Sequence, residues 1–183
     1  FPTRRSSDLQ HILGFFDDLV RTPVFLFLCA MFLCGAAAGG LTGLRAGEGD
    51  GAAVLSGLLA ELPAHVVQST LCALIWVLLP LVCAFLRPRE LLLSAVAAAR
   101  GFVLAMTVAV SVGEGNALII GAAGVPAVLS VSALLAACSM VWQGGEATGR
   151  YSLRTCRMPY FLCITLAALS ALLRAAIAAL CNV

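Results

Sequence analysis

The chain has 183 residues, of which 62% are hydrophobic and only 11% are charged, and its mean hydropathy is +1.05. A soluble domain is about half apolar and about a quarter charged, so this composition excludes an ordinary water-soluble fold and requires a lipid phase. The formal net charge of +2 is too small for a strongly basic surface, and we expect no nucleic-acid partner.

The first nine residues, Phe1 to Leu9, read FPTRRSSDL, which resembles a translated sequencing-adapter oligonucleotide. We therefore interpret residues 1–9 as a non-native segment that takes no part in the fold. The native chain is expected to begin near Gln10, and residues 10–183 are expected to form a single membrane domain.

Five apolar stretches are long enough, or nearly long enough, to cross a bilayer as helices, which need about 20 apolar residues to do so. Pro23 opens the first stretch at a position that favours proline, whereas Pro80 and Pro126 lie inside the second and fourth stretches. The sequence therefore predicts an all-α, polytopic membrane helix bundle with five spans, at about residues 23–44, 70–86, 91–112, 117–142 and 159–180.

The arginines are divided unequally between the two sets of connecting segments. One set holds six of them and the other holds only Arg45; the six are Arg21, Arg87, Arg89, Arg150, Arg154 and Arg157. Positively charged segments stay on the cytoplasmic side of a membrane. We therefore expect a multi-pass protein of the cell membrane with its N-terminus in the cytoplasm and its C-terminus outside.

The segment after the first span has a helical pattern of its own. Apolar residues from Val54 to Val66 recur at helical spacing around Pro63, which predicts a short amphipathic helix on the outer membrane surface. Glu61 and His65 lie four residues apart in it and could share one face, but a metal site needs at least three ligands. We interpret them as a polar pair at the interface.

Side chains that could carry chemistry are too scattered to predict an active site. Most of the eight cysteines lie in or beside apolar runs without a CxxC pair, so they are interpreted as small buried hydrophobes. The predicted spans contain serines but no histidine that could serve as a base. The sequence thus predicts no catalytic, cofactor or metal site, and a protein that is not an enzyme.

The third predicted span carries a polar stripe. Arg100 lies about 13–14 Å along the helix from Leu91, which is near the bilayer midplane. Arg100, Thr107, Ser111 and Glu114 fall within one arc of the helix, and such a stripe faces protein or water rather than lipid.

A buried arginine needs polar partners. The expected partners of Arg100 are carbonyls freed at Pro80 or Pro126, a hydroxyl such as that of Ser130, or water. A structural role for Arg100 and a functional one remain equally open.

A second arc of the same span carries the small residues Ala97, Gly101 and Ala105, whose spacing favours close approach of another helix. The candidate functional site combines both arcs with the proline of the next span: Arg100, Gly101, Thr107, Ser111, Glu114 and Pro126.

Three short motifs follow one another in this region: Arg100 to Leu104 (RGFVL), Gly113 to Gly115 (GEG) and Gly124 to Ala127 (GVPA). Together with the glycines of the first span, they resemble the stage II sporulation protein M family; these glycines are Gly35, Gly39, Gly40 and Gly43. The chain departs from the family where Ala127 to Leu129 replace a polar amide that often follows the proline.

The resemblance implies a small polytopic membrane protein that takes part in engulfment of the forespore during sporulation. It also implies a non-enzymatic scaffold whose partners are the lipid bilayer and membrane-associated peptidoglycan hydrolases. The alternative function is the membrane subunit of a permease or transporter, which Arg100 and the proline-kinked fourth span would suit.

Overall fold

The computed structural model describes residues 20–45, 66–113, 117–146 and 157–180, together with Gly14 and Asp17. Within these ranges the chain forms five long helices: α2 (Pro23–Arg45), α4 (Val66–Cys83), α5 (Arg89–Gly113), α6 (Ala117–Glu146) and α7 (Arg157–Leu180). The all-α prediction is confirmed for them. The predicted non-native segment 1–9 and the predicted amphipathic helix before Val66 lie outside the described residues.

Three of the helices contain segments long and apolar enough to cross a membrane: Pro23–Arg45, Arg89–Ala109 and Pro126–Gly144. Two more segments, Leu74–Cys83 and Pro159–Leu173, are apolar but shorter. The described part of the chain is therefore a helix bundle of the multi-pass membrane type, and the full count of five spans stays a prediction.

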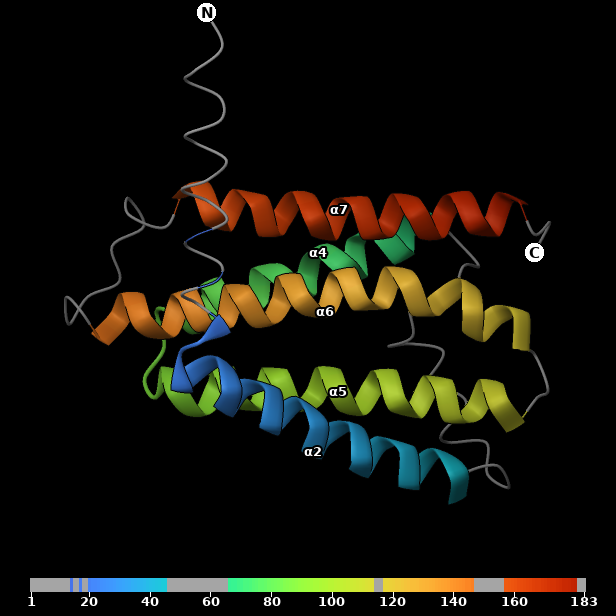
Figure 1. Ribbon diagram of the computed structural model, residues 1–183, viewed down its shortest axis with the longest axis horizontal. Helices are drawn as coiled ribbons and strands as arrows, with labels where there is room; N and C mark the ends of the chain where they lie inside the picture. The colour runs from blue at the N-terminus through green and yellow to red at the C-terminus, as the bar shows by residue number, and fades with distance from the viewer. Residues whose placement is uncertain are drawn as a thin grey trace, which may run out of the picture.

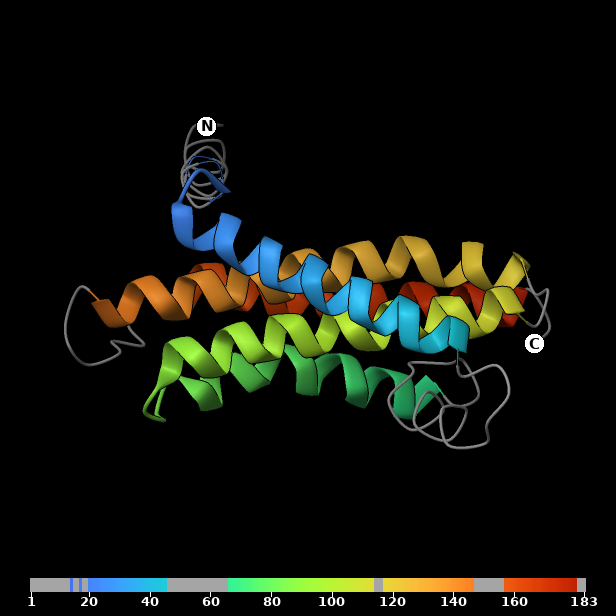
Figure 2. The same cartoon turned by 90° about the horizontal axis from the view of Figure 1, so that it is seen from below.

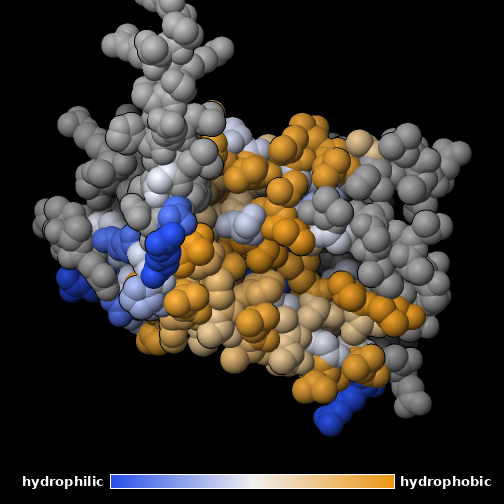
Figure 3. All heavy atoms as spheres, viewed as in Figure 1, coloured by the Kyte–Doolittle hydropathy of each residue, from blue (hydrophilic) through white to orange (hydrophobic). Residues whose placement is uncertain are grey.

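The helices lie along one long axis, and successive helices run in opposite directions (Figures 1 and 2). α2, α5 and α7 run one way, whereas α4 and α6 run the other way. Orange, hydrophobic spheres cover much of the face between the two ends of the bundle, and the blue, hydrophilic ones lie toward the ends (Figure 3). This is the surface that a bilayer requires of a spanning bundle.

The ends of two helices follow from their local sequence. Pro23 takes the first position of α2, and the hydroxyl of Thr22 accepts a hydrogen bond from the backbone N–H of Phe25 (3.4 Å), as an N-cap does. The second helix ends at Cys83, three residues earlier than the predicted 86, because the chain tightens into a turn there. In this turn the N–H of Leu86 bonds the carbonyl of Cys83 at 3.1 Å.

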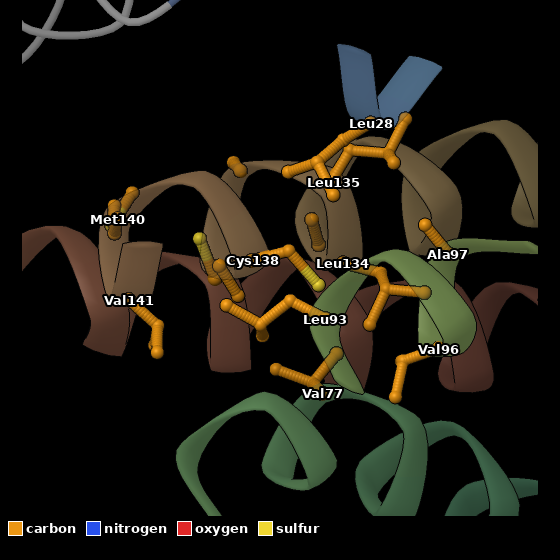
Figure 4. Packing of buried hydrophobic residues seen from close by; sticks show 14 of the residues in the cluster. Leu28, Val77, Leu93, Val96, Ala97, Leu134, Leu135, Cys138, Met140 and Val141 are labelled. Atoms are coloured by element: carbon orange, nitrogen blue, oxygen red, sulfur yellow. The ribbon is translucent and has the colours of Figure 1, made fainter. Parts of the chain in front are cut away.

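α6 is the central helix of the bundle. Every side chain from Ala133 to Val141 is buried, so this part of α6 is enclosed on all sides, as expected for a helix that is apolar all round. Figure 4 shows Leu28 of α2 beside Leu135, with Leu93 of α5 and Val77 of α4 on another side of α6. The small alanines in this stretch let four helices pack around it.

α2 and α6 are also joined at one end of the bundle. The side-chain amide of Gln143 in α6 donates a hydrogen bond of 3.1 Å to the hydroxyl of Thr22 at the start of α2. The rings of Phe27 and Trp142 meet edge to face, with their centroids 5.9 Å apart. Tryptophan is enriched at the level of lipid headgroups, so a junction at the end of the bundle is a position that suits it.

Candidate functional site

Arg100 is the largest fully buried side chain in the described part of the chain. It lies in the middle of α5, about 16 Å along the helix from Arg89, and only 1% of it is exposed. The prediction that this arginine faces protein rather than lipid is therefore confirmed. An arginine at the centre of a membrane helix costs about 2.5–3.5 kcal/mol on insertion scales, so its contacts must offset that cost.

The guanidinium of Arg100 contacts two other helices. Its Nη2 donates a hydrogen bond of 3.0 Å to Oγ of Ser130 in α6, and that hydroxyl in turn donates to the carbonyl of Ala127 at 3.1 Å. Its central carbon lies 5.1 Å from the ring centroid of Trp76 in α4, which is a cation–π contact. We call this set of Arg100, Ser130 and Trp76 the arginine clasp, since it joins α4, α5 and α6.

Both prolines inside helices lie one turn from a residue of the arginine clasp. Pro126 precedes Ser130 by four residues, Pro80 follows Trp76 by four, and both rings are buried. A proline lacks the N–H that the carbonyl four residues earlier would accept, so it leaves backbone acceptors inside an otherwise apolar bundle. The carbonyl that Pro80 leaves without its helical donor is that of Trp76, so one member of the clasp lies at such an acceptor.

One carbonyl beside Pro80 is bound by a neighbouring helix. The hydroxyl of Tyr160 in α7 donates a hydrogen bond of 2.6 Å to the carbonyl of Val77, and both groups are buried. The polar interior therefore extends from the arginine clasp on one side of α4 to α7 on the other. Each described polar contact in this interior either joins two helices or gives a backbone carbonyl of a helix a hydrogen-bond donor.

Gly101 faces a different helix from its neighbour Arg100. A Cβ atom added to Gly101 would collide with the backbone of Phe32 in α2 and would lie 3.0 Å from the backbone nitrogen of Ala36. Only glycine lets two helices approach this closely, as in small-xxx-small membrane motifs. The predicted close approach of another helix at Gly101 is confirmed, and the partner is α2.

The glycines of α2 complete this contact from the other side. A Cβ on Gly35 would lie 2.8 Å from Cα of Ala98, and one on Gly39 would lie 2.7 Å from Cα of Phe102. Residue numbers rise together along both helices, so α2 and α5 pack in parallel. Since the two helices point the same way along the bundle, this contact requires α4 to return the chain between them (Figure 1). We call the surface formed by Gly35, Gly39, Gly43 and Gly101 the glycine contact.

The remaining candidates do not join the arginine clasp. Thr107 is half-buried about 10 Å further along α5, and its hydroxyl donates to the carbonyl of Val103 at 2.7 Å. The side chain of Ser111 and the whole of Glu114 lie outside the described residues. Of the six predicted site residues, Arg100 belongs to the clasp, Pro126 lies one turn before its partner Ser130, and Gly101 belongs to the glycine contact.

Ser130 was an expected partner of Arg100, but Trp76 was missed. The available signal was a tryptophan one turn before Pro80, in a stretch that is otherwise apolar and has no other aromatic side chain. Nothing in the sequence pairs that tryptophan with a residue 24 positions later. Its assignment to the clasp required the packing of α4 against α5.

The buried thiols of the described part of the chain pack among apolar side chains. Cys83, Cys138 and Cys163 are free and belong to the hydrophobic core. Among the described residues, no group of three His, Cys, Asp or Glu side chains could hold a metal ion.

No family model, no curated protein and no solved structure matches the chain.

Proposed function

We propose that this protein is a non-enzymatic scaffold in the cell membrane that organises cell-wall-degrading partners during engulfment of the forespore. The proposal joins two lines of support. The first is the resemblance of the RGFVL, GEG and GVPA motifs to the stage II sporulation protein M family. The second is the arginine clasp, whose buried polar groups serve to hold helices together.

The arginine clasp is the observation that carries the scaffold role. The guanidinium of Arg100 is enclosed by Trp76 and Ser130 and is 1% exposed, so it contacts helices of its own chain rather than solvent. A cation–π contact contributes about 0.5–2 kcal/mol and a hydrogen bond from a charged group about 1.5–3 kcal/mol, which together match the insertion cost of an arginine. Because the gain from these contacts is close to the cost of inserting the charge, the arginine clasp adds little to the free energy of unfolding. It does favour this arrangement of the helices, since any other would leave the charge without its partners.

A permanent arrangement of helices suits a protein that presents surfaces to partners. The backbone-to-backbone glycine contact keeps α2 against α5, while the arginine clasp keeps α5 against α4 and α6. The proposed orientation places the N-terminus in the cytoplasm, because most arginines in connecting segments then lie on the cytoplasmic side.

A permease or transporter subunit is the second candidate, and the two buried prolines beside the arginine clasp favour it. Kinked helices next to a buried charge line the binding sites of some transporters. In that case Arg100 has to meet a solute or water during the transport cycle, so its environment must change. The two candidates therefore differ in whether the guanidinium ever leaves Trp76 and Ser130.

Deleting the gene in its own host and following the cell membrane by fluorescence microscopy tests the scaffold role. The proposal predicts that the membrane stops migrating around the forespore and that the full chain restores migration. It also predicts that the purified protein releases no fragments from peptidoglycan. Normal engulfment in the deletion strain, or a host that forms no spores, would show that the sporulation role is wrong.

A solute-uptake assay in proteoliposomes, with Arg100→Met as the control, separates the second candidate from the first. Uptake that this variant abolishes would favour the transporter.

A further inference from the structure

The short turn between α4 and α5 combines two arginines with exposed apolar side chains. Arg87 is exposed and Arg89 is half-buried, and only Pro88 separates them. Phe85 is 70% exposed and Leu86 is 50% exposed in the same turn. We call residues 85–89 the arginine turn, and its composition is that of a segment placed at the boundary between lipid chains and headgroups.

Neither arginine of this turn is occupied by another part of the described chain. Within the described ranges the one ion pair joins Arg21 to Asp17 (3.0 Å), and neither Arg87 nor Arg89 takes part in a side-chain hydrogen bond. The nearest opposing charge in sequence is the exposed carboxylate of Glu90. The turn therefore keeps an excess of positive charge that faces outward from the bundle.

We propose that the arginine turn binds the phosphate group of an anionic membrane phospholipid. A guanidinium presents two parallel N–H donors, which match the oxygens of a phosphodiester. Arg87 is exposed and Arg89 is half-buried, so both can offer these donors to a phosphate. Two arginines separated by one residue place two such donors at a single headgroup.

The apolar neighbours select a lipid over a soluble anion or an acidic protein. Phe85 and Leu86 precede the arginines, and Leu91, which is 68% exposed, follows them in the first turn of α5. A ligand that covers all of these groups needs an apolar chain joined to a negative phosphate, and a phospholipid has both. The turn lies at the end of the bundle where α2 begins and α6 ends (Figure 1), and the Phe27–Trp142 pair joins those two helices there. An end of the bundle is where lipid headgroups would meet a spanning protein.

The test uses the full chain purified into nanodiscs that contain equal parts of phosphatidylcholine and phosphatidylglycerol. Native mass spectrometry then measures which lipids stay bound to the released protein. The proposal predicts that phosphatidylglycerol is retained several-fold over phosphatidylcholine, and that Arg87→Gln combined with Arg89→Gln removes this preference. Arg45→Gln is the matched control and should leave the preference unchanged. Arg45 is also an exposed arginine, but it is the last residue of α2 and lies at the other end of the bundle from the arginine turn.

Two single variants test the charge of the arginine turn without altering the helix core. Glu90→Gln removes the opposing charge and should increase retention of phosphatidylglycerol. The single change Arg87→Gln affects an exposed side chain outside the helices, so it should reduce retention without loss of the folded protein. Equal retention by the double variant and the wild type would overturn the proposal, as would complete displacement of phosphatidylglycerol by millimolar inorganic phosphate.

Discussion

Arg100 of α5 donates a hydrogen bond of 3.0 Å to Ser130 of α6, and both side chains are buried at the centre of the bundle. The acceptor belongs to a helix that contains Pro126 one turn earlier. The pair therefore connects a charge that is costly in lipid to a hydroxyl that also bonds the backbone of its own helix. The contribution of this hydrogen bond to the free energy of unfolding can be measured by replacing each partner in turn.

Replacing Ser130 with alanine removes one acceptor from a buried guanidinium. Leaving a buried polar group without its partner costs about 1–3 kcal/mol, so the free energy of unfolding in detergent micelles should fall by that amount. Ser132→Ala is the control, because this serine is exposed and its hydroxyl bonds only the carbonyl of Leu129 (3.0 Å). Equal losses for the two variants would show that the hydroxyl of Ser130 has no special role.

Replacing Trp76 with leucine removes the aromatic face beneath Arg100 but keeps an apolar side chain in α4. A cation–π contact away from water contributes about 2 kcal/mol, so Trp76→Leu should lower the free energy of unfolding by about that much. Trp76→Phe keeps an aromatic ring and should lose less. An Arg100→Met background removes the cation, and there the difference between leucine and phenylalanine should disappear; a difference that persists would assign the effect to packing.

Gly39 and Gly40 form a matched pair on α2. A Cβ on Gly39 would lie 2.7 Å from Cα of Phe102, whereas a Cβ on Gly40 would have nothing within 4 Å. Gly39→Ala should therefore separate α2 from α5 and reduce the folded fraction measured by thermal unfolding. Gly40→Ala should leave it unchanged or raise it, since alanine favours a helix by up to about 1 kcal/mol over glycine. Similar effects at both positions would contradict the parallel α2–α5 contact.

The orientation of the bundle is open to labelling of introduced cysteines. Arg45→Cys and Arg87→Cys place a thiol at exposed positions at opposite ends of the helices. With the N-terminus in the cytoplasm, a membrane-impermeant maleimide should label Arg45→Cys in intact cells and Arg87→Cys only after permeabilisation. The reverse pattern would place the N-terminus outside.

The sequence was sufficient to locate the helices, but it did not show which helices pack against one another. Runs of apolar residues located all five helices, and the start at Pro23 was correct. The burial of Arg100 followed from the cost of placing a charge in lipid. The contact between Gly101 and α2 could not be predicted, because small residues indicate a close approach without naming the second helix. Trp76 was missed because the part of α4 around it, residues 71–79, is apolar on every side, so periodicity does not reveal which face meets protein.

A double-mutant cycle between Arg100 and Ser130 tests the arginine clasp most directly. The free energies of unfolding are measured for the wild type, Arg100→Met, Ser130→Ala and the double variant. Because the side chains are in contact, we predict a coupling energy of about 1–3 kcal/mol, with Ser130→Ala costing little once the charge is gone. Arg100→Met alone should be near neutral, since an apolar side chain often replaces a buried charge without loss. Additive effects of the two substitutions would contradict the account, because they would mean that Arg100 and Ser130 do not hold α5 and α6 together.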